Sequence, residues 1–165
     1  MIGVVTGIRD LSRASERAVD RAIAEALERD LDEMRFGGAR GTDTVALRAA
    51  FAWRQVRGSA KPLLRVYVPG RLIEQPAEAR AVADRCADAV VGLGLPLQHA
   101  SSYLDRNEAM LEGADTLLAF TDGRMQGGTA WTLQRAAERG MEVVTVSVRA
   151  AQQGASRRRQ GRARR

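Results

Sequence analysis

Short apolar runs rich in β-branched residues alternate along this chain with longer stretches whose apolar side chains recur every three or four positions. The clearest runs are IGVVT at Ile2–Thr6 and TLLAF at Thr116–Phe120, and each has the length of one buried strand. The longer stretches carry acids and arginines between their apolar residues, as amphipathic helices do. Strands that alternate with helices are typical of a parallel sheet with helices on both faces. The pattern therefore predicts a single α/β domain with a mostly parallel sheet of about five to six strands.

The same pattern gives each element an approximate position. Helices are expected at Ser12–Asp30, Thr42–Val56, Pro76–Leu93, Ser101–Glu112 and Thr129–Arg139. Strands are expected at Ile2–Thr6, Met34–Gly37, Leu63–Val68, Leu95–Gln98, Thr116–Phe120 and Glu142–Val148. These elements assign residues 1–148 to one domain. The remaining residues, 149–165, form an arginine-rich tail without apolar periodicity, which we expect to be disordered.

The positive charge of the chain is concentrated in this tail. The formal net charge is +6, but seven of the 26 basic residues are arginines within 149–165, where no acid occurs. The rest of the chain carries 19 basic and 20 acidic residues, a net charge of −1. A groove that binds nucleic acid is expected to be basic without help from a tail, so this distribution favours a small ligand for the domain itself.

Single residues limit the other classes of site. Cys86 is the only cysteine and His99 the only histidine, so the sequence offers no internal disulfide and no multi-histidine metal site. Cys86 lies in an alanine-rich amphipathic stretch and is interpreted as a small core residue. The chain has no run of about 18 apolar residues and no basic region ahead of an apolar signal core. We expect a bacterial cytoplasmic protein with no bound metal.

Glycine-rich loops follow three of the predicted strands. Glycine permits tight turns and a close approach of a ligand to backbone amides, and the N-terminus of a helix attracts phosphate. In sheets of this kind ligands bind beyond the carboxyl ends of the strands, where these loops lie. The predicted ligand-binding residues of the three loops are Thr6, Gly7 and Arg9, then Gly37, Gly38, Arg40, Gly41, Thr42 and Asp43, then Gly127, Gly128 and Thr129.

Three further residues complete the predicted site. Arg106 and Asn107 lie on a helix just before the strand Thr116–Phe120, and Asp122 lies in the polar loop after it. Each loop taken alone also has a structural interpretation, since Thr42 and Asp43 are natural helix-capping residues. Neither a P-loop nor a G-x-G-x-x-G motif is present, which disfavours a P-loop NTPase and a standard dinucleotide dehydrogenase.

Taken in order, these motifs resemble the SLOG superfamily, a Rossmann-like group that includes the DNA-processing protein DprA (Smf) and the cytokinin-activating LOG enzymes. The resemblance is greatest to its small stand-alone YspA-like members. It is carried by VTGIRD (5–10), GGARGTDTVA (37–46), RNEAML (106–111), GADTLLAF (113–120) and GGTAWTLQRAAERGMEVVTV (127–146). It implies a Rossmann-like domain whose glycine loops bind nucleotide-type ligands or nucleic acid.

Two departures from the family pattern affect the expected function. The first loop usually reads G-S-R in such proteins, and here it is Gly7-Ile8-Arg9. LOG enzymes carry P-G-G-x-G-T-x-x-E, in which the glutamate serves catalysis. Here the leading proline is missing, and Thr132 stands about where the glutamate would be. The resemblance therefore argues against LOG chemistry.

Three functions follow from these observations. The leading hypothesis is a sensor or carrier of a nucleotide or nucleotide-derived phosphorylated ligand, which requires only the loops. The second is DprA-like binding of single-stranded nucleic acid, with salt-dependent contacts from Arg40 and the tail. The third is hydrolysis of an N-glycosidic bond, which usually requires a carboxylate near the sugar, such as Asp43, Glu108 or Asp122. We expect the protein to form a homo-oligomer and to have no membrane partner. The suspected ligand is of the nucleotide type, and the sequence does not identify it further.

Overall fold

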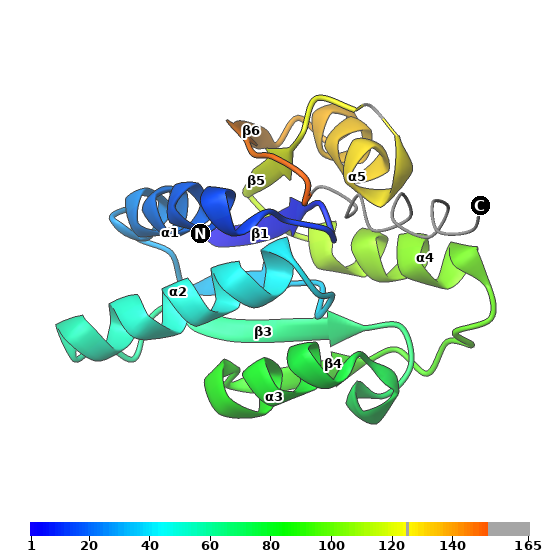
Figure 1. The fold of residues 1–165 in the computed structure, drawn as a ribbon, viewed down its shortest axis with the longest axis horizontal. Coiled ribbons are helices and arrows are strands. Elements are labelled where there is room, and N and C mark those ends of the chain that lie inside the picture. The colour runs from blue at the N-terminus through cyan, green and yellow to red at the C-terminus, as the bar shows by residue number, and fades with distance from the viewer. Residues whose placement is uncertain (125, 152–165) are drawn as a thin grey trace, which may run out of the picture.

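The computed structural model of the protein describes residues 1–124 and 126–151. Six strands form one all-parallel sheet, and five α-helices and one short 3-10 helix connect them. The strands are β1 (Ile2–Gly7), β2 (Glu33–Phe36), β3 (Leu63–Val68), β4 (Ala89–Gly92), β5 (Thr116–Thr121) and β6 (Glu142–Ser147). The helices are α1 (Arg13–Leu27), α2 (Thr42–Arg57), η1 (Leu72–Glu74), α3 (Ala77–Cys86), α4 (Ala100–Leu111) and α5 (Gly127–Glu138). The predicted α/β fold with a parallel sheet and helices on both faces is confirmed (Figure 1).

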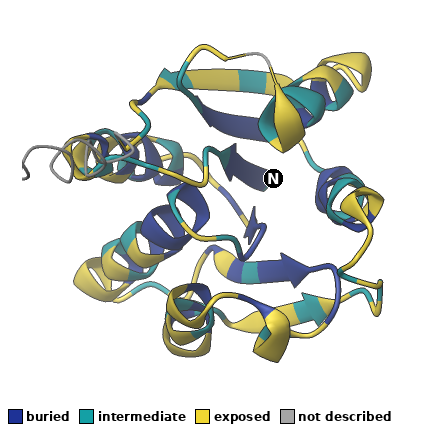
Figure 2. Ribbon diagram, turned by 45° about the vertical axis from the view of Figure 1, so that its right-hand side comes forward, coloured by how far each residue is buried: buried dark blue, intermediate teal, exposed yellow. Residues whose placement is uncertain are grey.

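Neighbouring residues of the central strands point to opposite faces of the sheet, and each face has its own core. Val5 and Leu118 belong to a core cluster that also includes Phe36 and residues of α1, α2 and α3. Val4 and Leu117, one position earlier, pack against α4 and α5. Because both faces are covered, these strands are apolar along their whole length, as buried parallel strands are. Figure 2 shows the buried residues gathered in the sheet and on the inner sides of the helices.

The order of the strands reverses direction beside β1. The sheet runs β4-β3-β2-β1-β5-β6, so the chain builds outward from β1 to β4 and then returns to place β5 on the other side of β1. The pairing of β1 with β5 joins residues far apart in the sequence, such as Gly3 with Thr116. Ligands of such sheets bind beside this reversal, outside the carboxyl ends of the strands. The loops after β1 and β5 flank that position.

The region between β3 and α4 differs from the sequence-based prediction. The predicted helix over Pro76–Leu93 ends at Cys86, and the strand β4 follows it. The predicted strand over Leu95–Gln98 is wrong, because this segment is a loop whose first amide, that of Leu95, donates to the carbonyl of Pro69 at 2.7 Å. The short run Ala89–Gly92 fits the end of a helix and an edge strand equally well, and its pairing with β3 decides between them.

The chain returns from β6 to the loop after β1. Ala150 pairs with Leu11, and the amide of Ala151 donates to the carbonyl of Asp10 at 2.7 Å. The prediction for the tail beyond this point, residues 152–165, lies outside the described residues. Within the part of the chain that is described, no helix is long and apolar enough to cross a membrane.

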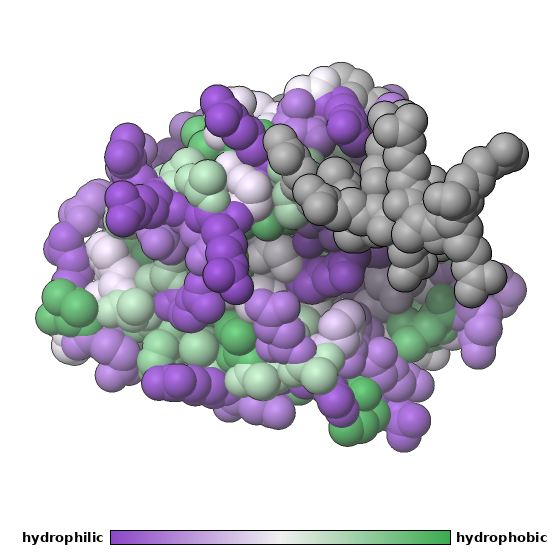
Figure 3. Space-filling model, viewed as in Figure 1, coloured by the Kyte–Doolittle hydropathy of each residue, from purple (hydrophilic) through white to green (hydrophobic). Residues whose placement is uncertain are grey.

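The surface carries no concentration of apolar side chains on the face drawn in Figure 3, apart from what the grey atoms cover. Hydrophilic side chains cover most of the described helices there, and apolar ones are scattered among them. The most exposed large apolar residues, Val56 and Ile73, belong to α2 and to the short helix η1. Scattered exposed apolar residues of this kind are normal for a folded domain.

Candidate functional site

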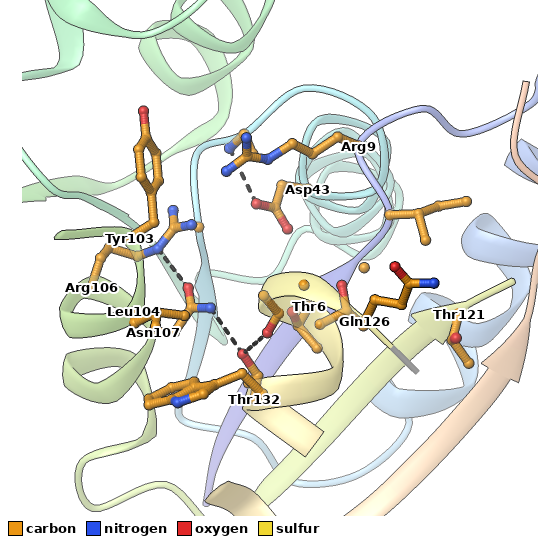
Figure 4. Close-up of a pocket in the computed structure, with 18 of the residues that line it drawn as sticks. Thr6, Arg9, Asp43, Tyr103, Leu104, Arg106, Asn107, Thr121, Gln126 and Thr132 are labelled. Atoms are coloured by element: carbon orange, nitrogen blue, oxygen red, sulfur yellow. Dashed lines mark hydrogen bonds between the residues drawn. The ribbon is translucent and has the colours of Figure 1, made fainter. Parts of the chain in front are cut away.

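A cavity of about 950 Å³ lies at the carboxyl ends of β1, β2 and β5. Its walls come from the loops after these strands, from α4 and from the first turns of α5 (Figure 4). This volume is within the range of small-molecule sites, about 300–1,000 Å³. The predicted site residues that line it are Thr6, Gly7, Arg9, Gly37, Asp43, Arg106, Asn107, Asp122, Gly127, Gly128 and Thr129.

Four predicted site residues do not line the cavity, and each has another role. Thr42 donates its hydroxyl to the carbonyl of Ile8 at 2.9 Å and so fastens the β2 loop to the β1 loop. Gly38 packs against the side chains of β3. Arg40 pairs with Asp10 at 2.7 Å on the exposed surface. Gly41 has φ +81° and lies against the carbonyl of Arg9, where a Cβ would be 2.2 Å from the oxygen, so only glycine fits.

The N-terminus of α5 forms one end of the cavity. Gly127 and Gly128 have no side chains to cover the free amides of the first turn, and Thr129 adds a hydroxyl nearby. The positive end of the helix dipole and these amides together favour an anion. Thr6, at the end of β1, and Thr121, at the end of β5, line the same cavity. The arrangement suits the oxygen atoms of a phosphate group.

Two arginines and one carboxylate meet in another part of the cavity. Arg9 is exposed and lies over the ring of Tyr103, with its guanidinium carbon 5.0 Å from the ring centre. Arg106 is buried, and burial lowers the pKa of its guanidinium. Asp43 is also buried, and burial raises the pKa of its carboxyl, against the opposing effects of Arg106 and Arg9. Figure 4 shows the side chains of Arg9, Asp43 and Arg106 converging on this region.

A chain of hydrogen bonds joins α4 to α5 beneath the cavity. The Nε of Arg106 donates to Asn107 at 2.8 Å, and the side-chain amide of Asn107 donates to the hydroxyl of Thr132 at 2.9 Å. This hydroxyl in turn donates to the carbonyl of Gly128 at 2.7 Å. Thr132 is thus buried and fully engaged at the position where the LOG pattern has a catalytic glutamate. Its hydrogen bonds join Asn107 of α4 to the first turn of α5.

Sequence reasoning did not assign several of the residues that form the cavity wall. Tyr103 and Leu104 of α4 and Trp131 of α5 give the cavity an apolar, aromatic side. Asp10, Arg124 and Gln126 also line it. Tyr103 lies one helical turn before Arg106 and therefore on the same face of α4, which is the one signal in the sequence that pointed to it. Trp131 likewise lies one helical turn after Gly127 and Gly128, on the same face of α5.

The described residues contain no group of three or more side chains suited to hold a metal ion. Asp43 and Asp122 line the cavity, but the carboxylate of Asp122 is turned to its own loop, where it accepts from the amide of Arg124 at 3.1 Å. Glu108, the third carboxylate considered for hydrolysis, does not line this cavity and pairs with Arg135 at 3.0 Å. Asp43 is therefore the one buried carboxylate in the described cavity wall.

No protein-family model and no curated protein sequence matches the chain. Solved structures do match it. DprA from Streptococcus pneumoniae superposes with a TM-score of 0.66 at 23% identity, over 87% of this chain and 49% of that one. DprA from Helicobacter pylori, described as having a unique single-stranded DNA binding mode, gives a TM-score of 0.64 at 18% identity, over 88% and 64%. The structure of TM1055 gives 0.55 at 21% identity, over 86% and 71%.

These matches show that the chain shares its fold with the DprA structures and with TM1055. The chain spans about half and about two thirds of the two DprA chains, so it corresponds to a part of each. At these identities the likeness concerns the fold.

Proposed function

We propose, starting from this shared fold, that the protein binds a nucleotide or a nucleotide-derived phosphorylated ligand in the cavity at the carboxyl edge of its sheet. The observation that carries the proposal is the position of the N-terminus of α5. Its first turn, Gly127–Thr129, lines the same cavity as Arg9. Arg9 forms no ion pair with a carboxylate in the described structure. Its positive charge and the free amides of the helix are therefore available to bind the negative charge of a phosphate.

Aromatic side chains of the same cavity suit the rest of a nucleotide. Tyr103 of α4 and Trp131 of α5 provide aromatic surface, and Leu104 of α4 also lines the cavity. Flat bases stack on such side chains, and this contact is worth about 1–3 kcal/mol for a base. A ligand that combines a phosphate with a flat ring therefore matches the two kinds of group that line the cavity.

Isothermal titration calorimetry with AMP and with inorganic phosphate tests this function. We expect AMP to bind more tightly than phosphate, because the aromatic wall adds to the phosphate contacts. Replacing Arg9 by alanine removes a charged hydrogen bond to phosphate and should weaken AMP binding by about 1.5–3 kcal/mol. Arg48→Ala is the matched control, because Arg48 pairs with Glu16 on the surface and does not line the cavity. Equal binding by the Arg9→Ala variant and the wild type would contradict the proposal.

A second candidate function is binding of single-stranded nucleic acid. It is favoured by the fold shared with a DprA whose single-stranded DNA binding mode has been described, and by six arginines without an acid in residues 152–165. Contacts of arginines with phosphates release counterions, so such binding weakens steeply as salt is raised. Fluorescence anisotropy of a labelled oligodeoxynucleotide across a salt series tests it on the full chain. Tight, salt-sensitive DNA binding together with no binding of AMP would replace the first proposal by this one.

A further inference from the structure

Asp43 and Arg106 are buried near each other at the cavity wall, yet their side chains form no direct ion pair among the described residues. Only 8% of Asp43 and 5% of Arg106 are exposed, and both line the cavity. No ion pair links Asp43 to Arg106 or to Arg9 among the described residues. Buried opposite charges that approach one another usually pair directly, because their isolation in a protein interior is costly.

Gly37 makes room for the two groups, whose polar atoms lie where its side chain would be. A Cβ at this position would lie 2.6 Å from Nη1 of Arg106 and 2.7 Å from Oδ2 of Asp43. Both side chains therefore flank the bare backbone of Gly37, and any larger residue would displace one of them. The missing side chain lets both groups lie against the backbone of Gly37 at the cavity wall.

The hydrogen bonds within the protein leave part of each group unused. Asp43 accepts from the amide of Ala39 at 3.1 Å, which secures the β2 loop. Arg106 uses Nε for Asn107 and Nη1 for the carbonyl of Tyr67 at 3.2 Å. Its Nη2 makes no hydrogen bond to another described residue, and Arg9 contributes a second guanidinium whose described contact is the ring of Tyr103. Donors and an acceptor thus face the same small space.

The mixture of charges restricts what this space accepts. A phosphate offers only acceptors and is repelled by the carboxylate of Asp43. An ammonium group offers only donors and is repelled by two guanidinium groups. A hydroxyl group both donates and accepts, so it satisfies Asp43 and an arginine at the same time. A pair of neighbouring hydroxyls, such as those of a ribose ring, does this twice.

We propose that Asp43 and Arg106 form a ribose subsite, which makes the cavity selective for ribonucleotides over 2′-deoxyribonucleotides. This inference rests on the proposed nucleotide-binding function and names the class of nucleotide. Desolvation raises the pKa of Asp43, and a hydroxyl that donates to its carboxylate adds a hydrogen bond that favours the ionised form. Asp43 has a structural role too, through Ala39, but that role needs only an acceptor oxygen, which asparagine also provides.

Calorimetric titration of the full chain with AMP and with 2′-deoxy-AMP tests the inference, because the two ligands differ in one hydroxyl. We expect the wild type to bind AMP about 10- to 100-fold more tightly, the range for one hydrogen bond to a charged group. The Asp43→Asn variant keeps the size of the side chain and the bond to Ala39, and its preference should fall to about twofold or less. Asp20→Asn, on the exposed side of α1, changes the same functional group away from the cavity and should keep the wild-type preference.

The possible outcomes distinguish a failure of the ribose subsite from a failure of the proposed nucleotide-binding function. Equal binding of AMP and 2′-deoxy-AMP by the wild type overturns the ribose subsite and leaves the proposed function standing. A preference that persists unchanged in Asp43→Asn overturns the assignment to Asp43. Failure of both nucleotides to bind the wild type overturns the proposed function, and the inference with it. The wild-type comparison needs no variant, so it decides the question even where Asp43→Asn does not fold.

Discussion

The side-chain amide of Asn107 in α4 donates a 2.9 Å hydrogen bond to the hydroxyl of Thr132 in α5, and both residues are buried. This bond joins the helix that carries Arg106 to the helix that begins with Gly127 and Gly128, and all three residues line the cavity. The cavity therefore has a rigid base that spans two elements.

Replacing Asn107 by leucine should lower the free energy of unfolding by about 1–3 kcal/mol, because the Nε of Arg106 and the hydroxyl of Thr132 both lose a buried partner. Urea denaturation followed by circular dichroism measures the change. Thr132→Ser keeps the hydroxyl and should cost less than Asn107→Leu. A leucine variant as stable as the wild type would show that the bond contributes nothing to stability.

The raised pKa of Asp43 predicts a specific pH dependence of stability without ligand. A carboxyl whose pKa is higher in the folded than in the unfolded state binds protons more readily when folded. Stability therefore falls as pH rises from 3.8, the ordinary pKa of an aspartate, through the pKa of the folded state. Asp43→Asn removes this cost of ionisation. We expect the variant to gain stability relative to the wild type between acidic and neutral pH, measured by urea denaturation at several pH values. A difference that stays constant with pH would contradict the burial of an ionised Asp43.

Another buried charge, that of Arg54 in α2, lies away from the cavity and beside the start of β4. Arg54 is 6% exposed and donates to Asp88 through Nη1 at 2.6 Å and through Nη2 at 3.1 Å. Asp88→Ala leaves this guanidinium buried without its carboxylate and should cost about 3–5 kcal/mol in the free energy of unfolding. The control is Glu16→Ala, which removes the exposed partner of Arg48 and should cost about 0–1 kcal/mol. Similar losses from both variants, measured by urea denaturation, would contradict this reasoning.

Truncation separates the docked part of the C-terminal segment from the rest. Removing residues 152–165 should leave the melting temperature nearly unchanged, because that sequence has no apolar face to bury. Removing 149–165 also deletes the bond from the amide of Arg149 to Ser15 at 2.8 Å and the pairing of Ala150 with Leu11. The longer deletion should therefore lower the melting temperature by several degrees, the order expected for about 1 kcal/mol. Differential scanning calorimetry of the two variants gives the comparison.

The fold was predictable because its central strands are continuous apolar runs that only a covered parallel sheet accommodates. Ile2–Gly7 and Thr116–Thr121 were each expected to within one residue. The strand Ala89–Gly92 was missed because its four small apolar residues, at an exposed edge of the sheet, show no alternation of apolar and polar positions. Its pairing with β3 joins residues far apart in the sequence, and the local sequence does not predict this pairing.

The loops of the site were predictable from glycine and strand position, but the direction of individual side chains was not. Arg9 and Arg40 both follow glycines in such loops, and only Arg9 lines the cavity. The ion pair of Arg40 with Asp10 holds its guanidinium outside, and this contact joins loops 30 residues apart. The aromatic wall was missed for a related reason, since Tyr103 and Trp131 read as ordinary apolar members of amphipathic helices.

The two sides of the cavity come from opposite ends of the chain. Thr6–Arg9 lie within the first ten residues, whereas Gly127–Thr132 follow β5. During synthesis, β1 to β4 emerge before β5, so a nascent chain that ends before β5 contains four of the six strands but not the α5 side of the cavity. The pairing of β1 with β5 closes a loop of more than a hundred residues, the kind of step that slows folding. A ligand that needs both sides recognises only the finished fold, and its binding raises the stability of the whole domain by mass action.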